Sequence, residues 1–482
     1  MKDLARLALD TAAARGSHYA DARAVELTRE DVQVKNGEVG GLDLSESRGL
    51  GVRVLVGGSW GFAATDDLTK GGVERCAAQA VAIGRASASL KHENVRLAPE
   101  AAHRSVWASE FTTDPFQVTL ERKLDLLFRI DAEMRAVKGV RNAESFLTFQ
   151  RRRQFFLSTE GSDIEQTLTR SGGGFASTAV SDDDVQRRSF PQAEGFHQSL
   201  GYEFIESIPF VENARRIAEE SVALLTAAQC PAGEQDIILE GSQLALQIHE
   251  SVGHPTELDR VLGMEANYAG TSFLTLEKRG KLAFGSKIVN LVADATLPHG
   301  LATFGFDDDG VEAQRWHIVR DGLFVGYLTS RELAHRVGEA RSRGCVRSDG
   351  WHHIPMIRMV NLSLMPGSGS LEDLLHDSDR ALLMETNRSW SIDQLRYNFQ
   401  FKTELAWEIR KGKRVRLLKN PTYQGITTQF WNSCDFICGA DEWKPWGVTN
   451  CGKGQPGQVA EITHGAAPAR FRKVQVGAGY EG

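Results

Sequence analysis

The chain has 482 residues, of which 41% are hydrophobic and 25% charged, the ordinary composition of a soluble globular protein. At about 150 residues per domain, this length predicts two or three domains. The net charge of -7 argues against a general nucleic-acid-binding protein, which usually carries a basic face, so no nucleic-acid partner is expected.

The N-terminal sequence MKDLARLALDTAAARG predicts an amphipathic helix over residues 3–15, because Leu4 and Leu7 fall on one helical face. The stretch carries Asp3 and Asp10 and lacks the continuous apolar region of a signal peptide. No window of about 18 apolar residues occurs elsewhere, so we expect no membrane association and a cytoplasmic location. In that compartment the cysteines are expected to be reduced thiols. They are Cys76, Cys230, Cys345, Cys434, Cys438 and Cys451.

Residues 21–66 alternate between apolar and polar positions, which predicts antiparallel strands. Asn36-Gly37 is a hairpin signal, because both residues tolerate positive φ. Helices are expected at 68–86, 118–138 and 209–227, with further strands over 143–181. The first half is therefore predicted to be a mixture of antiparallel strands and flanking helices, divided into subdomains 1–110 and 111–230.

From residue 231 onward the pattern changes to many short β-like runs around one prominent helix. A strand at Asp236–Leu239 leads into a helix that starts near Ser242, and Asp321-Gly322 predicts a later hairpin. We predict an α+β protein whose C-terminal domain, residues 231–482, is mostly antiparallel β-sheet.

This helix carries His249-Glu250-Ser251-Val252-Gly253-His254, a pattern of the form H-E-x-x-x-H. The histidines of common zinc proteases are four residues apart and share one helix face. Histidines five residues apart are separated by about 140° on an ideal helix and cannot bind one ion. We therefore expect the helix to end near His249. Gly253, which adopts unusual backbone conformations, and Pro255, which disfavours the α conformation before it, would then turn His254 back sharply.

Two histidines make an incomplete site, because catalytic zinc usually has three protein ligands and one open position. The sequence leaves the third ligand open among five candidates: Cys434, Cys438, Cys451, Glu257 and Asp259. Glu250, adjacent to His249, is the natural general base for a zinc-activated water. The motif alone is short enough to arise by chance in a chain with 13 histidines.

The motif and the later sequence Asn450-Cys451-Gly452-Lys453-Gly454-Gln455 together resemble the TldD branch of the TldD/PmbA family. Gly49–Val54 and Gly58–Ala63 resemble the first domain of that family, so the resemblance spans nearly the whole chain. It implies a cytoplasmic zinc peptidase that cleaves extended or unfolded peptides. Carried over to this sequence, it implies that His249, His254 and Cys451 bind Zn²⁺ and that Glu250 is the base.

The resemblance further implies a dimer, formed either with a second copy or with a PmbA-type subunit that lacks the metal motif. Two positions depart from the usual family pattern: Ser251 stands where many members have Ala, and Pro255 where many have Gly. Two other functions stay open, a non-catalytic scaffold or regulatory subunit and a zinc amidase that acts on a non-peptide amide.

Several other residues carry side chains that often bind metals or ligands. Cys434 and Cys438 are interpreted as ordinary thiols, and His352-His353 as a pair without a metal. Asp307-Asp308-Asp309-Gly310 lacks the glutamate that ends a calcium loop and is predicted to be a solvated turn. One of three arginines is expected to hold a substrate carboxylate or an oxyanion. The candidates are Arg315, Arg388 and Arg396.

Overall fold

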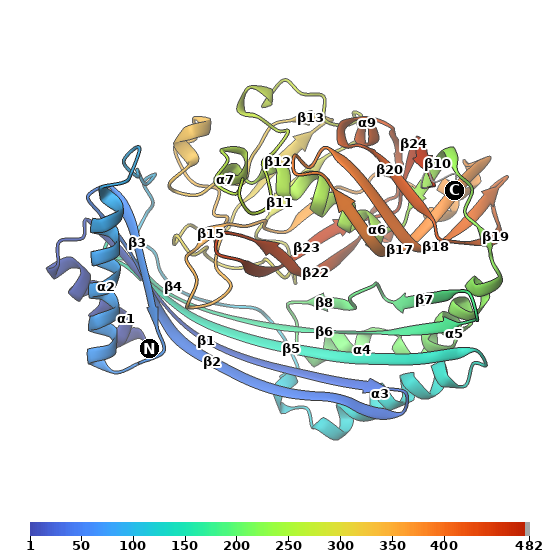
Figure 1. Cartoon of the computed structure of the whole chain (residues 1–482), viewed down its shortest axis with the longest axis horizontal. Helices are drawn as coiled ribbons and strands as arrows, with labels where there is room; N and C mark the ends of the chain where they lie inside the picture. The colour runs from blue at the N-terminus through green and yellow to red at the C-terminus, as the bar shows by residue number, and fades with distance from the viewer. Residues whose placement is uncertain (478–482) are drawn as a thin grey trace.

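The computed structural model describes residues 1–477 of the chain as two layers (Figure 1). A long curved sheet from the first half forms one layer, and the C-terminal half covers its concave face. Most strand pairs are antiparallel, which confirms the predicted α+β class.

The first sheet has eight strands. Six of them lie side by side in the spatial order β3-β2-β1-β5-β6-β4, and β7 and β8 also pair with β6. Four of its strands are 17 to 19 residues long, which gives the sheet its length. The predicted hairpin at Asn36-Gly37 joins two of them, with φ of 50° and 82° at the two residues. The strands are β1 (Tyr19–Lys35), β2 (Glu38–Val56), β3 (Ser59–Thr65), β4 (Arg104–Ala108), β5 (Val140–Ser158), β6 (Asp163–Val180), β7 (Val185–Phe190) and β8 (Phe196–Gln198).

Helices cover this sheet at its two ends (Figure 1). One pair buries an alanine-rich face against β1–β3, and three others pack phenylalanines and aliphatic residues against β5 and β6. The pair is α1 (Lys2–Ala14) and α2 (Lys70–Ala88), and the others are α3 (Leu120–Arg135), α4 (Tyr202–Ser207) and α5 (Phe210–Thr226).

The C-terminal half contains a closed ring of five strands. They pair in the order β17-β10-β24-β20-β18, and β18 also pairs with β17, which closes the ring. β19 and β9 extend it beyond β18, and β21 pairs with β24. The strands are β9 (Ala228–Gln229), β10 (Gly233–Leu239), β17 (Arg380–Ile392), β18 (Asn398–Arg410), β19 (Lys413–Lys419), β20 (Thr422–Ile426), β21 (Cys434–Ile437) and β24 (Ala469–Val476).

Smaller sheets and short helices complete this half. A four-stranded sheet contains β11 (Leu291–Asp294), β12 (Arg315–Arg320), β13 (Leu323–Phe324) and β16 (Leu362–Leu364). Two further sheets have two strands each: β14 (Val346–Arg347) with β15 (Met356–Ile357), and β22 (Lys444–Lys453) with β23 (Gln458–Ala466). The helices are α6 (Gly241–Ile248), α7 (Leu258–Val261), α8 (Leu371–His376) and α9 (Thr427–Asn432).

The predicted turn at Asp307–Gly310 is present, with the Gly310 N–H donating to the Asp307 carbonyl at 3.0 Å, but it is buried, so the predicted exposure to solvent is wrong. Each of the three aspartates is at most 5% exposed as a whole residue. Asp308 pairs with Arg23 of β1 at 3.2 Å, and Asp309 pairs with Arg53 of β2 at 2.6 Å. Buried carboxylates need such partners, and these arginines lie more than 250 residues away in the sequence.

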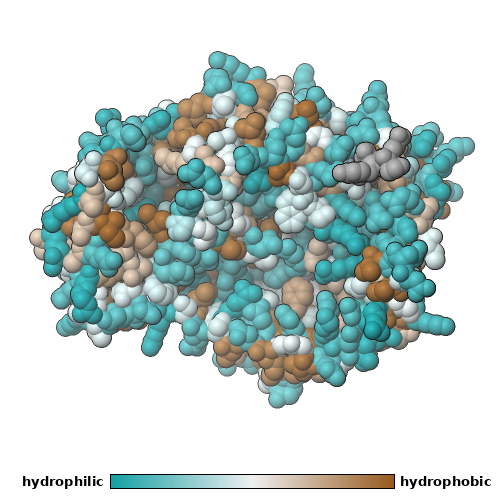
Figure 2. Space-filling model, viewed as in Figure 1, coloured by the Kyte–Doolittle hydropathy of each residue, from teal (hydrophilic) through white to brown (hydrophobic). Residues whose placement is uncertain are grey.

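The face drawn in Figure 2 is mainly hydrophilic, with hydrophobic residues in small separate patches. Across residues 1–477, every helix is too short or too polar to cross a membrane.

Candidate metal centre

The metal motif lies at the end of α6, where the helix widens instead of ending. Residues His249–Gly253 form a π-helical turn, and the backbone N–H of His254 donates to the carbonyl of His249. An i→i+5 hydrogen bond stacks residues five apart one turn above each other, which brings both imidazoles to one side. Their ring centroids lie 4.9 Å apart.

The predicted sharp exit at His254 is therefore wrong. Gly253 and His254 keep right-handed helical backbone angles, and Pro255 is the middle residue of a short 3₁₀ turn, His254–Thr256, that follows directly. Glycine is required at 253 for space, since a Cβ there would lie 2.0 Å from the sulfur of Met359. Ser251 has a partner of its own, because its Oγ accepts the indole N–H of Trp431 at 3.0 Å.

The ring of His249 is oriented by a second histidine, His464 of β23. His464 donates from Nδ1 to the carbonyl of Leu362 at 2.8 Å, since a carbonyl can only accept. Burial and the neighbouring His249 hold the pKa of His464 well below its usual value, so its Nε2 is an acceptor. That Nε2 lies 2.8 Å from Nδ1 of His249. His249 must donate there, which leaves its own Nε2 lone pair free.

His254 is oriented in the same way by Glu257. Its Nδ1 lies 2.9 Å from Oε2 of Glu257, and its Nε2 faces Cys451. Lys453, buried and 3.1 Å from the same carboxylate, neutralises it and also pairs with Asp259 at 2.9 Å. Burial alone would raise the pKa of Glu257, but Lys453 and His254 outweigh burial and hold it below its usual range.

Cys451 comes from β22, more than 190 residues after the helix. A bulge between Val448 and Cys451 interrupts the pairing of β22 with β23 just before the cysteine. Arg358 donates to the Cys451 carbonyl. Burial would raise the pKa of the Cys451 thiol, but the nearby His254 and Arg358 outweigh it and the pKa lies below its usual value.

The ligand atoms of His249, His254 and Cys451 all lie within 4.8 Å of one another, and the Cys451 sulfur is 3.7 Å from Nε2 of His254. Tetrahedral zinc, with bonds of about 2.0 Å to nitrogen and 2.3 Å to sulfur, separates its ligand atoms by roughly 3.5 Å. The donor set and its spacing are thus consistent with Zn²⁺.

Within residues 1–477 this is the one group of three His, Cys, Asp or Glu side chains with metal-binding spacing. Of the other candidates, Glu257 supports His254 and Asp259 pairs with Lys453. Cys434 and Cys438 lie outside the group, and burial raises the pKa of Cys438 to about 12, as expected of an unreactive thiol.

Glu250 lies beside His249 and is 5% exposed. Its Oε1 accepts the indole N–H of Trp390 at 2.9 Å, and its Oε2 pairs with Arg396. Burial acts to raise the pKa of Glu250, but His254, Arg396 and His249 together lower it, so the carboxylate is ionised at neutral pH. Of the three arginines singled out in the sequence, Arg396 alone reaches this motif; Arg315 pairs with Asp294 and Arg388 with Gln186.

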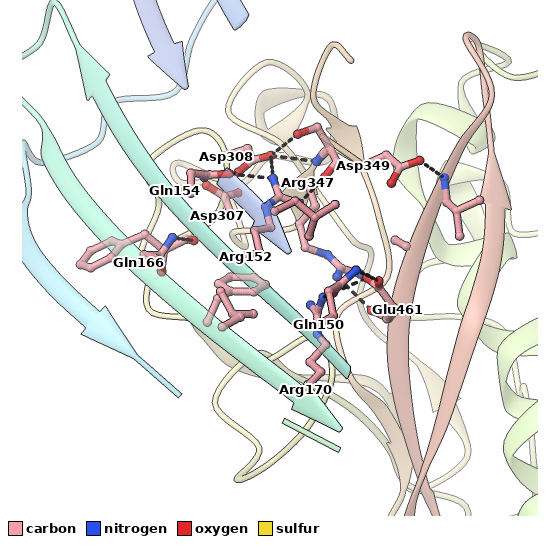
Figure 3. Close-up of a pocket in the computed structure, with 17 residues that line it drawn as sticks. Gln150, Arg152, Gln154, Gln166, Arg170, Asp307, Asp308, Arg347, Asp349 and Glu461 are labelled. Atoms are coloured by element: carbon pink, nitrogen blue, oxygen red, sulfur yellow. Dashed lines mark hydrogen bonds and ion pairs between the residues drawn. The ribbon is translucent and has the colours of Figure 1, made fainter. Parts of the chain in front are cut away.

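A small pocket of about 40 Å³ borders the site. Trp390, which contacts Glu250, and Asn450, which precedes Cys451, both line it. A second pocket, of about 50 Å³, lies between β5, β6 and β23 (Figure 3). Its arginines face carboxylates such as Asp308 and Glu461, and none of the motif residues lines it.

Sequence reasoning missed His464, Lys453, Arg358 and Trp390. Lys453 alone had a local signal, because it lies in the same short segment as Cys451. The others are single residues in unrelated strands and loops, with no spacing that connects them to the motif.

Comparisons with known proteins show to which family the chain belongs. Models of three domains match in order: PmbA/TldA metallopeptidase domain 1 over residues 20–84, the central domain over 113–226, and the C-terminal domain over 232–476. The chain belongs to the PmbA/TldA metallopeptidase family.

Among its relatives is a metalloprotease of Methanothermobacter thermautotrophicus, 28% identical over 95% of each chain. Another is a zinc metalloprotease TldD homologue of Saccharolobus solfataricus, 20% identical over 89% of this chain and 90% of that protein. A putative modulator of a DNA gyrase from Thermotoga maritima has the same fold, with a TM-score of 0.77, 17% identity, and coverage of 98% of this chain and 99% of that one.

Proposed function

We propose that this protein is a zinc-dependent peptidase in which His249, His254 and Cys451 hold the metal and Glu250 is the general base. One observation carries the proposal: two Nε2 atoms and one sulfur converge, while both Nδ1 atoms are committed to buried partners. Metal-binding histidines almost always use their second nitrogen in this way.

The chemistry needs few parts. When bound, zinc supplies polarisation of the scissile carbonyl and acidifies the attacking water. Glu250 accepts the proton of that water on a carboxylate oxygen and then passes it to the leaving amine nitrogen. Because an ionised carboxylate has about four acceptor positions, its bonds to Trp390 and Arg396 leave room for the water.

The substrate is proposed to be an extended or unfolded peptide. The pocket beside Trp390 and Asn450 lies along β22. Within residues 1–477, β22 pairs with β23 alone, so its other edge has no strand partner. Free main-chain groups at a strand edge bind a peptide with little sequence preference. A cytoplasmic location and a dimer with itself or with a PmbA-type subunit are part of the same proposal.

Metal analysis combined with peptide hydrolysis tests this function. The wild type should contain one zinc per chain and cleave unstructured peptides, and His249→Ala should lose the metal. Glu250→Gln should keep the metal and lose activity by about 10²–10⁴-fold, the usual contribution of a general base.

Three results would contradict the proposal in different ways. Full activity in Glu250→Gln would remove the assigned base. Bound metal without hydrolysis of any peptide or amide would favour a regulatory subunit. Hydrolysis of small amides but not of peptides would favour an amidase.

A further inference from the structure

Both carboxylate oxygens of Glu250 are contacted by one hairpin, the turn that joins β17 to β18. Trp390 lies near the end of β17 and donates its indole N–H to Oε1 at 2.9 Å. Arg396 lies in the turn itself and donates to Oε2. The carboxylate of the proposed base is thus held by two hydrogen-bond donors that are six residues apart in sequence.

The backbone of this turn is fixed on several sides. The Asp393 carboxylate accepts the backbone N–H of Tyr397 at 2.7 Å, and the Thr427 hydroxyl donates to the Arg396 carbonyl at 2.9 Å. Phe273 donates its backbone N–H to the Leu395 carbonyl at 3.0 Å. Arg396 itself has φ of 63°, a conformation that a non-glycine residue keeps only when its surroundings enforce it.

The contact is also well shielded, since the side chains of Glu250 and Arg396 are 7% and 15% exposed. A charge-assisted hydrogen bond in such surroundings is stronger and more directional than one in water. Trp390 differs, because it is 43% exposed and lines the pocket beside the site. The hairpin therefore connects this pocket to the orientation of Glu250.

We propose that Arg396 and Trp390 are positioning residues that act through Glu250 and aim its carboxylate at the metal centre. This inference rests on the proposed function and deepens it by making the β17–β18 turn a part of the catalytic machinery. A misplacement of about 1 Å in a reacting group can cost on the order of 100-fold in rate.

A kinetic double-mutant cycle tests the coupling, with metal content measured on every variant. Arg396→Met should keep the metal and lower kcat on the order of 100-fold with KM changed less than about threefold. Trp390→Phe, which keeps an aromatic ring but removes the indole N–H donor, should lower kcat about 10-fold. Neither change should lower activity further when Glu250 is already Gln. Arg388→Met, in the same hairpin but bonded to Val185 and Gln186, is the matched control and should have wild-type kcat.

The metal-free protein provides a readout that does not depend on activity. Arg396→Met should lower its Tm, because it leaves the Glu250 carboxylate buried without its ionic partner. Adding Glu250→Gln should restore much of the loss. This cycle still tests the pairing even if the wild type proves to have no peptidase activity.

Two outcomes would overturn the inference. Equal losses of kcat from Arg396→Met in the wild-type and Glu250→Gln backgrounds would show that the arginine acts independently of Glu250. A rise in KM alone, with kcat unchanged and no effect on the Tm of the metal-free protein, would assign it to substrate binding.

Discussion

His249 and His254 each use Nδ1 for a buried partner, His464 in one case and Glu257 in the other. The two partners differ chemically. Glu257 brings a negative charge that Lys453 compensates, whereas His464 is neutral and is itself held by a hydrogen bond to the backbone carbonyl of Leu362. Both arrangements fix the tautomer that presents Nε2 to the metal, so both should contribute to affinity.

Replacing His464 by Phe tests this contribution. An aromatic ring is kept, but His249 loses its acceptor, and we expect zinc affinity to fall about 10–100-fold. Competition against a chromophoric chelator measures it. His197→Phe, a change to a buried histidine outside the motif, is the control; an unchanged affinity in His464→Phe would show that the ring of His249 needs no such support.

At the scale of elements, the π-helical turn explains the extra residue in H-E-x-x-x-H. A regular α-helix would point the two histidines in different directions, and the widened turn restores their common side. The turn packs closely against Met359, with room for a hydrogen atom only at position 253.

Gly253→Ala should therefore destabilise the protein and weaken metal binding. Alanine normally favours a helix by about 1 kcal/mol, but overpacking against buried Met359 costs about 1–3 kcal/mol and decides the sign. Chemical denaturation and metal titration measure both effects. Gly452 is next to Cys451, but a Cβ added there would meet no atom within 4 Å. Gly452→Ala should therefore change stability by less than about 0.5 kcal/mol. A stabilised Gly253→Ala would contradict the packing argument.

The packing of β8 against β6 makes stability depend on pH through His197. Burial lowers the pKa of His197 to about 4, so the folded protein binds its proton only near that pH, whereas the unfolded chain binds it below about 6.5. The contribution to stability is complete above about pH 6.5 and declines as the pH falls to 4, by about 3 kcal/mol in total. Urea denaturation at several pH values should show a shallower acid dependence in His197→Phe; an identical dependence would refute the assignment.

At the scale of the whole molecule, the Asp307–Asp309 segment joins the C-terminal half to the long sheet. Asp308 accepts from Arg23, Gln154 and Ser348, of which the first two belong to β1 and β5. The predicted subdomain limits near residues 110 and 230 stay predictions, but this contact couples the first and last parts of the chain.

Asp308→Ala should cost about 3–5 kcal/mol, because it leaves the fully buried Arg23 without its ionic partner. Differential scanning calorimetry measures the loss and reveals whether the two layers then unfold separately. Asp43→Ala, at an exposed position of β2, is the control and should be nearly neutral. A neutral Asp308→Ala would mean that the contact does not hold the layers together.

The sequence by itself determined the class of the fold, the main helices and the Asn36-Gly37 hairpin, because periodicity and turn chemistry act over a few neighbouring residues. The motif also singled out His249, Glu250 and His254. Cys451 joined them only through the family resemblance, because the residues alone left the third ligand open among five, and the catalytic roles of all four stay a proposal. Tertiary structure alone decided the π-helical turn, the burial of Asp307–Asp309, and the partners of the motif. His464 lies 215 residues from His249, and Arg396 lies 146 from Glu250. At such separations the partner of a side chain is chosen by the packing of whole layers, which no local pattern records.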